Sequence, residues 1–75
     1  MRDILDVIDK MIKQVPDDND SLKSKLDKIR VRASYHAPED RLRDWNCLSF
    51  ELNNMLPYPP ETEWQKKIFR IMKGR

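Results

Sequence analysis

The chain has 75 residues, and its 15 basic and 13 acidic side chains give a net charge of +2 at pH 7. The 39% hydrophobic content and low net charge exclude full disorder, and no apolar run approaches the ~18 residues of a membrane span. Cys47 and His36 are the only residues of their types, which excludes an intrachain disulfide and a zinc site of the usual spacing.

The first half of the chain predicts two helices, bounded by a proline and a polar turn. A first helix near residues 2–15 presents one apolar stripe, and Pro16 ends it because the residue before a proline avoids the helical conformation. The turn that follows offers Asn19 or Asp20 as the cap of a second helix, near residues 20–35. The two stripes are Ile4, Ile8, Met11 and Val15, and then Leu22, Leu26, Ile29 and Ala33.

The second half predicts two further helices, each opened by a proline. Pro38 suits the first position of a third helix near residues 38–56, which at about 18 residues is expected to be the longest. Pro57 stops it, and Pro60 opens a fourth helix near residues 60–73. The stripes are Leu42, Trp45, Leu48, Leu52, Met55 and Leu56, and then Trp64, Ile68, Ile71 and Met72.

These elements predict an all-α fold, a small bundle of four helices in one domain of residues 1–75, with two long central helices and two shorter flanking ones. Residues 1–20 and 37–63 are net acidic, whereas 21–36 and 64–75 are net basic. Successive helices therefore attract one another, and this alternation favours antiparallel neighbours. We expect the core to centre on Trp45, Leu52, Leu26, Ile8 and Trp64.

Catalytic and cofactor chemistry has little support in the sequence. A nucleophile needs a base within hydrogen-bond reach, and nothing places Cys47 beside His36. The acidic turn 17–20 lacks the glycine and the bidentate glutamate of a calcium loop, and the one glycine, Gly74, cannot form a phosphate-binding loop. We therefore expect no enzyme activity, no metal and no cofactor.

Four apolar residues fall outside the stripes: Val31, Tyr35, Phe50 and Phe69. One interpretation is structural, because a helix that touches two neighbours buries a wider arc than one stripe. The other is an exposed apolar and aromatic patch with a basic rim, which is typical of binding surfaces. On the second interpretation the candidate partner-binding residues are Lys28, Val31, Arg32, Tyr35, Arg43 and Phe50.

The function predicted from these features is a small protein–protein interaction module without enzymatic activity, in the cytoplasm and outside the membrane. Its size suits a phage or mobile-element inhibitor of a host factor, and its small core favours a protein partner or self-association, for example as a homodimer. A nucleic-acid-binding domain is an alternative, because residues 21–36 are basic, although Glu39, Asp40, Asp44 and Glu51 in the next helix would repel phosphates. A second alternative is a small anionic ligand, such as a nucleotide, bound between the basic second and fourth helices.

Overall fold

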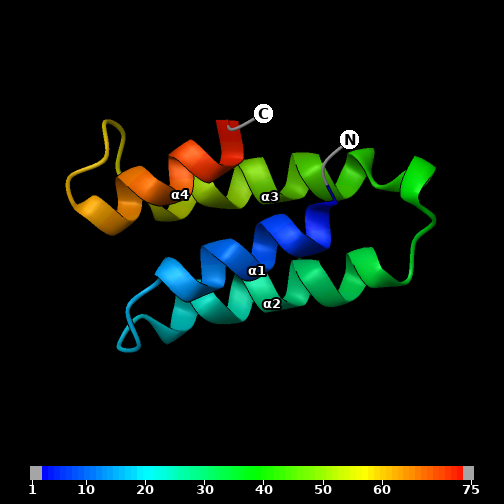
Figure 1. Cartoon of the computed structure of the whole chain (residues 1–75), viewed down its shortest axis with the longest axis horizontal. Coiled ribbons are helices and arrows are strands. Elements are labelled where there is room, and N and C mark those ends of the chain that lie inside the picture. Colours follow the sequence, from blue (N-terminus) through cyan, green and yellow to red (C-terminus); the bar gives the residue numbers. More distant parts are fainter. Residues whose placement is uncertain (1–2, 74–75) are drawn as a thin grey trace.

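The computed structural model describes residues 3–73, which form four α-helices and one short 3-10 helix (Figure 1). The elements are α1 (Ile4–Gln14), α2 (Asp20–Ser34), η1 (Pro38–Asp40), α3 (Leu42–Met55) and α4 (Glu63–Lys73). Across these residues there is no strand, and no helix is both long enough and apolar enough to cross a bilayer. The predicted all-α bundle is confirmed, including its two longer central helices of 15 and 14 residues between flanking helices of 11.

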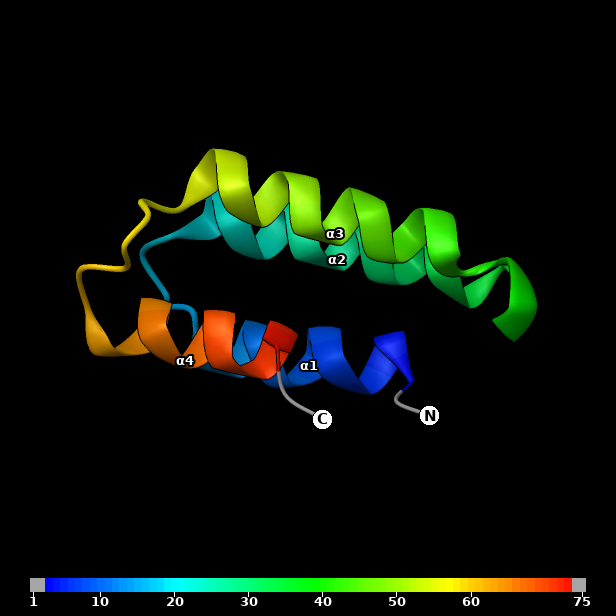
Figure 2. The same ribbon diagram turned by 90° about the horizontal axis from the view of Figure 1, so that it is seen from above.

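The helices run alternately up and down, so that each lies antiparallel to the next (Figure 1). Seen from above, α2 and α3 form one layer, and α1 and α4 form the other (Figure 2). The backbone of α1 packs closely against α2 and α4, and α2 packs against α3, but α3 and α4 approach each other at few points. The bundle therefore has three closed edges and one open edge, between α3 and α4.

The charge alternation predicted for the segments is weaker in the helices themselves. Basic α2 and α4 both lie beside α1, whose two acidic and two basic residues balance, and α2 also lies beside α3, which is acidic by one charge. Arg30 of α2 forms a two-pronged hydrogen bond with Asp9 of α1, at 2.7 Å from Nε and 3.4 Å from Nη2. Such a partly exposed pair adds little stability, but its fixed geometry favours one pairing of helices over others.

The core lies between the layers and is built from the predicted stripes. Ile8, Leu26 and Leu52 are buried, as expected. The prediction for the two tryptophans was wrong, because Trp45 and Trp64 are only half-buried and pack against the edge of the core. A ring as large as indole is rarely enclosed on all sides in a domain this small. The core consists of Ile4, Val7, Ile8, Met11, Val15, Leu22, Leu26, Ile29, Ala33, Leu48, Leu52, Leu56 and Ile68.

The first two helices begin at side-chain caps. The backbone N–H of Leu5 donates to Asp3 Oδ1 at 3.0 Å, and that of Leu22 donates to Asn19 Oδ1 at 3.4 Å. Asn19 is therefore the cap of α2, one of the two residues expected in that role. Arg2, the first residue of the predicted helix 2–15, lies outside the described residues.

The third helix is shorter than predicted, and α2 is the longest helix. Pro38 does start a helical turn, but this turn is the separate 3-10 helix η1. Arg41, with φ −81° and ψ 0°, stays in the right-handed helical region, but it lies between η1 and α3 and belongs to neither. Its side chain ties this junction to the rest of the fold, because its Nε donates to the carbonyl of Ala33 at 3.1 Å and its Nη1 donates to Asp3 Oδ1 at 3.2 Å.

The fourth helix starts at Glu63 rather than at Pro60. The side chain of Gln65 turns back, and its Oε1 accepts from the backbone N–H groups of Glu61, at 2.8 Å, and Thr62, at 3.2 Å. This is the glutamine half of a capping box, in which Thr62 is the cap and Gln65 stands three residues later. The T-x-x-Q spacing is present in the sequence. The cap at Thr62, and not Pro60, determines where α4 begins.

Leu42 was expected in the core, but it is 72% exposed. It occupies the first turn of α3, on the side that faces the open edge. Within the described residues, α4 runs beside only the C-terminal part of α3 (Figure 1), whereas Leu42 is the first residue of α3. The apolar stripe of α3 is thus longer than the helix that covers it.

Candidate interaction surface

Three contacts set the register between α2 and α3. Lys25 Nζ lies 3.7 Å from Glu51 Oε2, and Arg32 Nη1 lies 4.0 Å from Cys47 Sγ. At the end of the hairpin, His36 Nδ1 lies 2.7 Å from Asp44 Oδ2. These contacts identify the side of each helix that faces the other. They also show which residues of α2 lie beside which residues of α3.

The positions of the predicted binding residues follow from these three contacts. Lys28 lies between Lys25 and Arg32 along α2, and Phe50 lies between Cys47 and Glu51 along α3, so Lys28 and Phe50 stand at one level. Tyr35 and Arg43 precede His36 and Asp44 by one residue each, and therefore stand near the other end of the hairpin. At about 100° per residue, Lys28, Val31, Tyr35, Arg43 and Phe50 project outward from the α2–α3 layer, away from the core, and Arg32 lies beside them where α2 meets α3. We call the set the outer face: Lys28, Val31, Arg32, Tyr35, Arg43 and Phe50.

Every residue of the outer face is exposed, which separates the two interpretations of the off-stripe residues. Val31 is 44% exposed, Tyr35 82% and Phe50 63%. Phe69 behaves differently: it is half-buried and packs against the core from α4. The wider-arc interpretation therefore holds for Phe69, whereas the side chains of Val31, Tyr35 and Phe50 are exposed. That these three form a binding patch stays a prediction.

The cations of the outer face are largely free of acidic partners. Among residues 3–73, the ion pairs of α2 involve Lys23, Lys25 and Arg30, and none involves Lys28 or Arg32. Arg43 forms no ion pair with those residues either, unlike Arg41, which pairs with Asp3. The outer face thus combines three apolar side chains with three uncompensated positive charges.

Asp44 is another residue that sequence reasoning placed wrongly. It was expected to be a surface carboxylate of α3, but it is 1% exposed and hydrogen-bonded to His36. A buried carboxylate needs such a partner, because burial without one is costly. The pair closes the turn between α2 and α3, and Tyr35 and Arg43 each precede one of its members in the chain.

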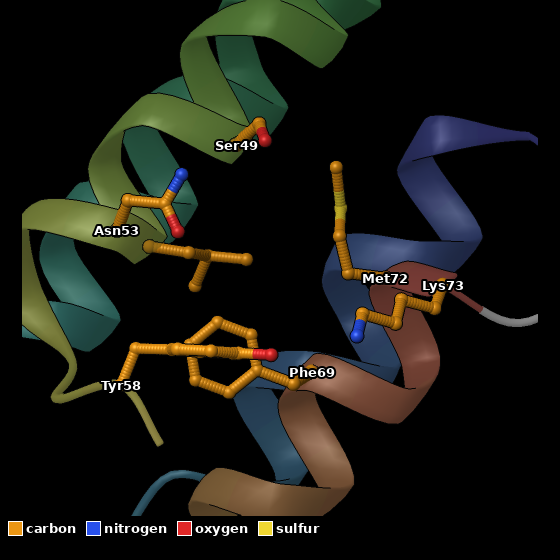
Figure 3. Close-up of a pocket in the computed structure, with 7 residues that line it drawn as sticks. Ser49, Asn53, Tyr58, Phe69, Met72 and Lys73 are labelled. Carbon is orange, nitrogen blue, oxygen red and sulfur yellow. The ribbon is translucent and has the colours of Figure 1, made fainter. Parts of the chain in front are cut away.

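A second surface feature lies at the open edge of the bundle. A recess of about 200 Å³ is lined by Ser49, Leu52, Asn53, Tyr58, Phe69, Met72 and Lys73 (Figure 3). Tyr58 comes from the loop between α3 and α4, and its ring meets that of Phe69 edge to face at 5.7 Å and 83°. The sequence showed Phe69 to be off its stripe, but the pairing with Tyr58 depends on the path of the loop.

The described residues contain no group of three or more His, Cys, Asp or Glu side chains able to hold a metal ion. The basic helices α2 and α4 stand at diagonally opposite corners of the bundle, with the core between them, so they do not share a cleft (Figures 1 and 2).

Comparison with protein-family models, with curated proteins and with solved structures found no match to this chain. What the molecule does must therefore be argued from its own surfaces.

Proposed function

We propose that this chain is a protein-binding module, and that its outer face docks an acidic partner protein. The observation that carries the proposal is the distribution of exposed large hydrophobic residues. Of the five in residues 3–73, four lie in the α2–α3 hairpin, and three of these, Val31, Tyr35 and Phe50, belong to the outer face. The remaining two are Leu42 and Tyr58.

Val31, Tyr35 and Phe50 lie outside the core cluster of the described residues. Helix capping and helix propensity do not require Tyr35 or Phe50. Exposure of their rings to water costs free energy, and a partner that buried them would remove this cost. Aromatic residues ringed by arginine are enriched where binding energy concentrates, because they bury a large rigid area with few rotatable bonds. Tyr35 and Phe50 are the two anchors in this proposal.

The positive charges define the chemistry of the partner. Lys28, Arg32 and Arg43 belong to the same face as the anchors, and none of them forms an ion pair within residues 3–73. Charges at a rim accelerate association with an oppositely charged surface and set its orientation, and they add less to affinity than the anchors do. The partner surface should therefore be acidic around an apolar centre.

Nucleic acid is the alternative that one observation favours. Two of the acidic residues expected to repel phosphates are compensated within the fold, since Asp44 is bonded to His36 and Glu51 pairs with Lys25. Phosphate contacts need cations, however, and gain nothing from exposed Val31 or Phe50. The apolar half of the outer face therefore supports a protein partner over a duplex.

Within this proposal the chain acts by stoichiometric binding in the cytoplasm, as an inhibitor or adaptor. A phage or mobile-element protein that disables a host factor is one such role. A second copy of the chain is a less suitable partner for the outer face, because two copies of one basic surface would repel each other.

The test is capture of a partner from a lysate of the native host, followed by mass spectrometry, with variants that remove exposed apolar side chains inside and outside the outer face. The double variant Tyr35→Ala/Phe50→Ala should lose the protein that the native chain captures. Leu42→Ala also removes an exposed apolar side chain, but outside the outer face, and should retain the captured protein. Equal capture by all three chains would contradict the proposal.

Salt and fold controls complete this test. Lys28→Glu/Arg32→Glu should slow association and reduce its salt dependence, whereas Lys10→Glu on exposed α1 surface should not. Circular dichroism should show the same helix content for every variant, and loss of fold in the Tyr35/Phe50 variant would mean that these rings are structural. Tight, salt-sensitive binding to a DNA duplex that the double alanine variant keeps would establish the nucleic-acid alternative instead.

A further inference from the structure

We propose that the recess at the open edge binds a small aromatic carboxylate, a ligand with one ring and one negative charge. This site is independent of the outer face: it lies on the other flank of α3, between that helix and α4 (Figures 2 and 3). The two surfaces can therefore be tested, and can fail, separately.

The walls of the recess favour a flat ring. Leu52 is 1% exposed and belongs to the core beneath the recess, while Phe69 and Met72 are half-buried. The edge-to-face pair of Tyr58 and Phe69 forms one wall, and aromatic rings pack well against ring edges and against thioether sulfur. An aromatic body would thus find more favourable contacts here than an aliphatic chain of equal size.

The polar groups of the recess favour an anion. Lys73 Nζ lies 6.0 Å from the centroid of the Tyr58 ring, and it pairs with no carboxylate of residues 3–73. None of the seven lining residues is acidic. The hydroxyl of Ser49 and the amide of Asn53 come from α3, across the recess from Lys73 (Figure 3). A carboxylate at the mouth would therefore meet one positive charge and neutral hydrogen-bond donors.

The volume limits the ligand to one ring. Pockets for drug-sized ligands span roughly 300–1,000 Å³, and this recess has about 200 Å³. A nucleotide, with base, sugar and phosphate, exceeds this space. A phenyl ring on a short acid fits both the volume and the distance from an apolar wall to a cation at the rim.

The experiment is an NMR titration of the native chain with 3-phenylpropionate, read on backbone amide signals. We expect saturable shifts at Ser49, Asn53, Met72 and Lys73, with a Kd on the order of 1 mM for a ligand of so few atoms. The neutral isostere 3-phenylpropanamide should bind more weakly, and acetate, which lacks the ring, should produce no saturable shift there. Equal binding of acid and amide, or shifts centred outside the recess, would overturn the proposal.

Variants of two lysines on one helix supply the matched control. Lys73→Gln keeps the length of the side chain and removes its charge, and it should weaken 3-phenylpropionate binding about threefold to tenfold. Lys67→Gln removes another exposed charge of α4, at a residue that does not line the recess, and should leave binding unchanged. The same loss in both variants would mean that net charge, and not the recess, attracts the ligand. Because the comparison of acid with amide uses the native chain, the result does not depend on either variant folding.

Discussion

The two flanks of α3 are built on different principles. Toward α2, three polar contacts join the helices along their length, and the hydrogen bond between His36 and Asp44 closes the turn. Toward α4, the backbones separate, and Tyr58 and Phe69 bound a recess. The closed flank fixes a surface in place, whereas the open flank leaves space. In so small a bundle, one helix thus serves both as a rigid support and as the wall of a cavity.

The largest effect is expected where both flanks depend on the same residue. Leu48 is fully buried in the middle of α3, and Leu48→Ala should lower the free energy of unfolding by about 2–5 kcal/mol. Leu42→Ala, on the same helix but exposed, should change it by less than about 0.5 kcal/mol. Urea denaturation followed by circular dichroism measures both, and similar losses would show that α4 covers more of α3 than Figure 1 indicates.

An intermediate effect should separate the closed flank from the open one. Asp44→Ala removes the buried partner of His36 and should cost about 1–3 kcal/mol in free energy of unfolding. Asn53→Ala on the open flank makes a similar change of helix propensity at an exposed position, and should cost less than about 0.5 kcal/mol. If the two variants unfold at the same urea concentration, the closed flank owes its stability to apolar packing alone.

The smallest effect concerns an exposed ion pair that belongs to neither flank. Asp17 is fully exposed, and the ammonium of Lys23, hydrogen-bonded to it at 2.6 Å, holds the pKa of its carboxyl below the ordinary value of 3.8. Because this pKa is lowered in the fold, the contact stabilises the protein above pH 3.8 and is lost as the pH falls through the lowered pKa. A carboxyl NMR titration should show the midpoint returning to about 3.8 in Lys23→Ala. A midpoint that does not move would assign the shift to another cause.

The sequence predicted the helices and the exposure of the outer face because both follow from local periodicity. Prolines separate the segments, and a 3.6-residue period places Val31, Tyr35 and Phe50 away from the buried stripes. That their rim is basic was also visible. Whether these residues bind a partner stays a prediction.

The features that the sequence did not predict depend on contacts between segments that are distant in the chain. A helical wheel places Asp44 on the buried stripe, four residues before Leu48, but its charge argues for the surface, and only the tertiary structure brings His36 beside it as a partner. Trp45 and Leu42 belong to the apolar stripe of α3, which is longer than the part of α3 that α4 covers. How much of α3 is covered depends on the residue at which the capping box starts α4. The recess likewise depends on how the loop at Tyr58 returns toward Phe69.

The close packing of α1 against α4 has a consequence for the order in which the bundle folds. Two of the closed edges join helices that are consecutive in the chain, and their connections are short, but the third joins the first helix to the last. Closing so long a loop is entropically costly, so the local hairpins should form before α4 docks on α1. Ile68, the buried residue of α4, then contributes mainly to the rate of unfolding and little to the rate of folding.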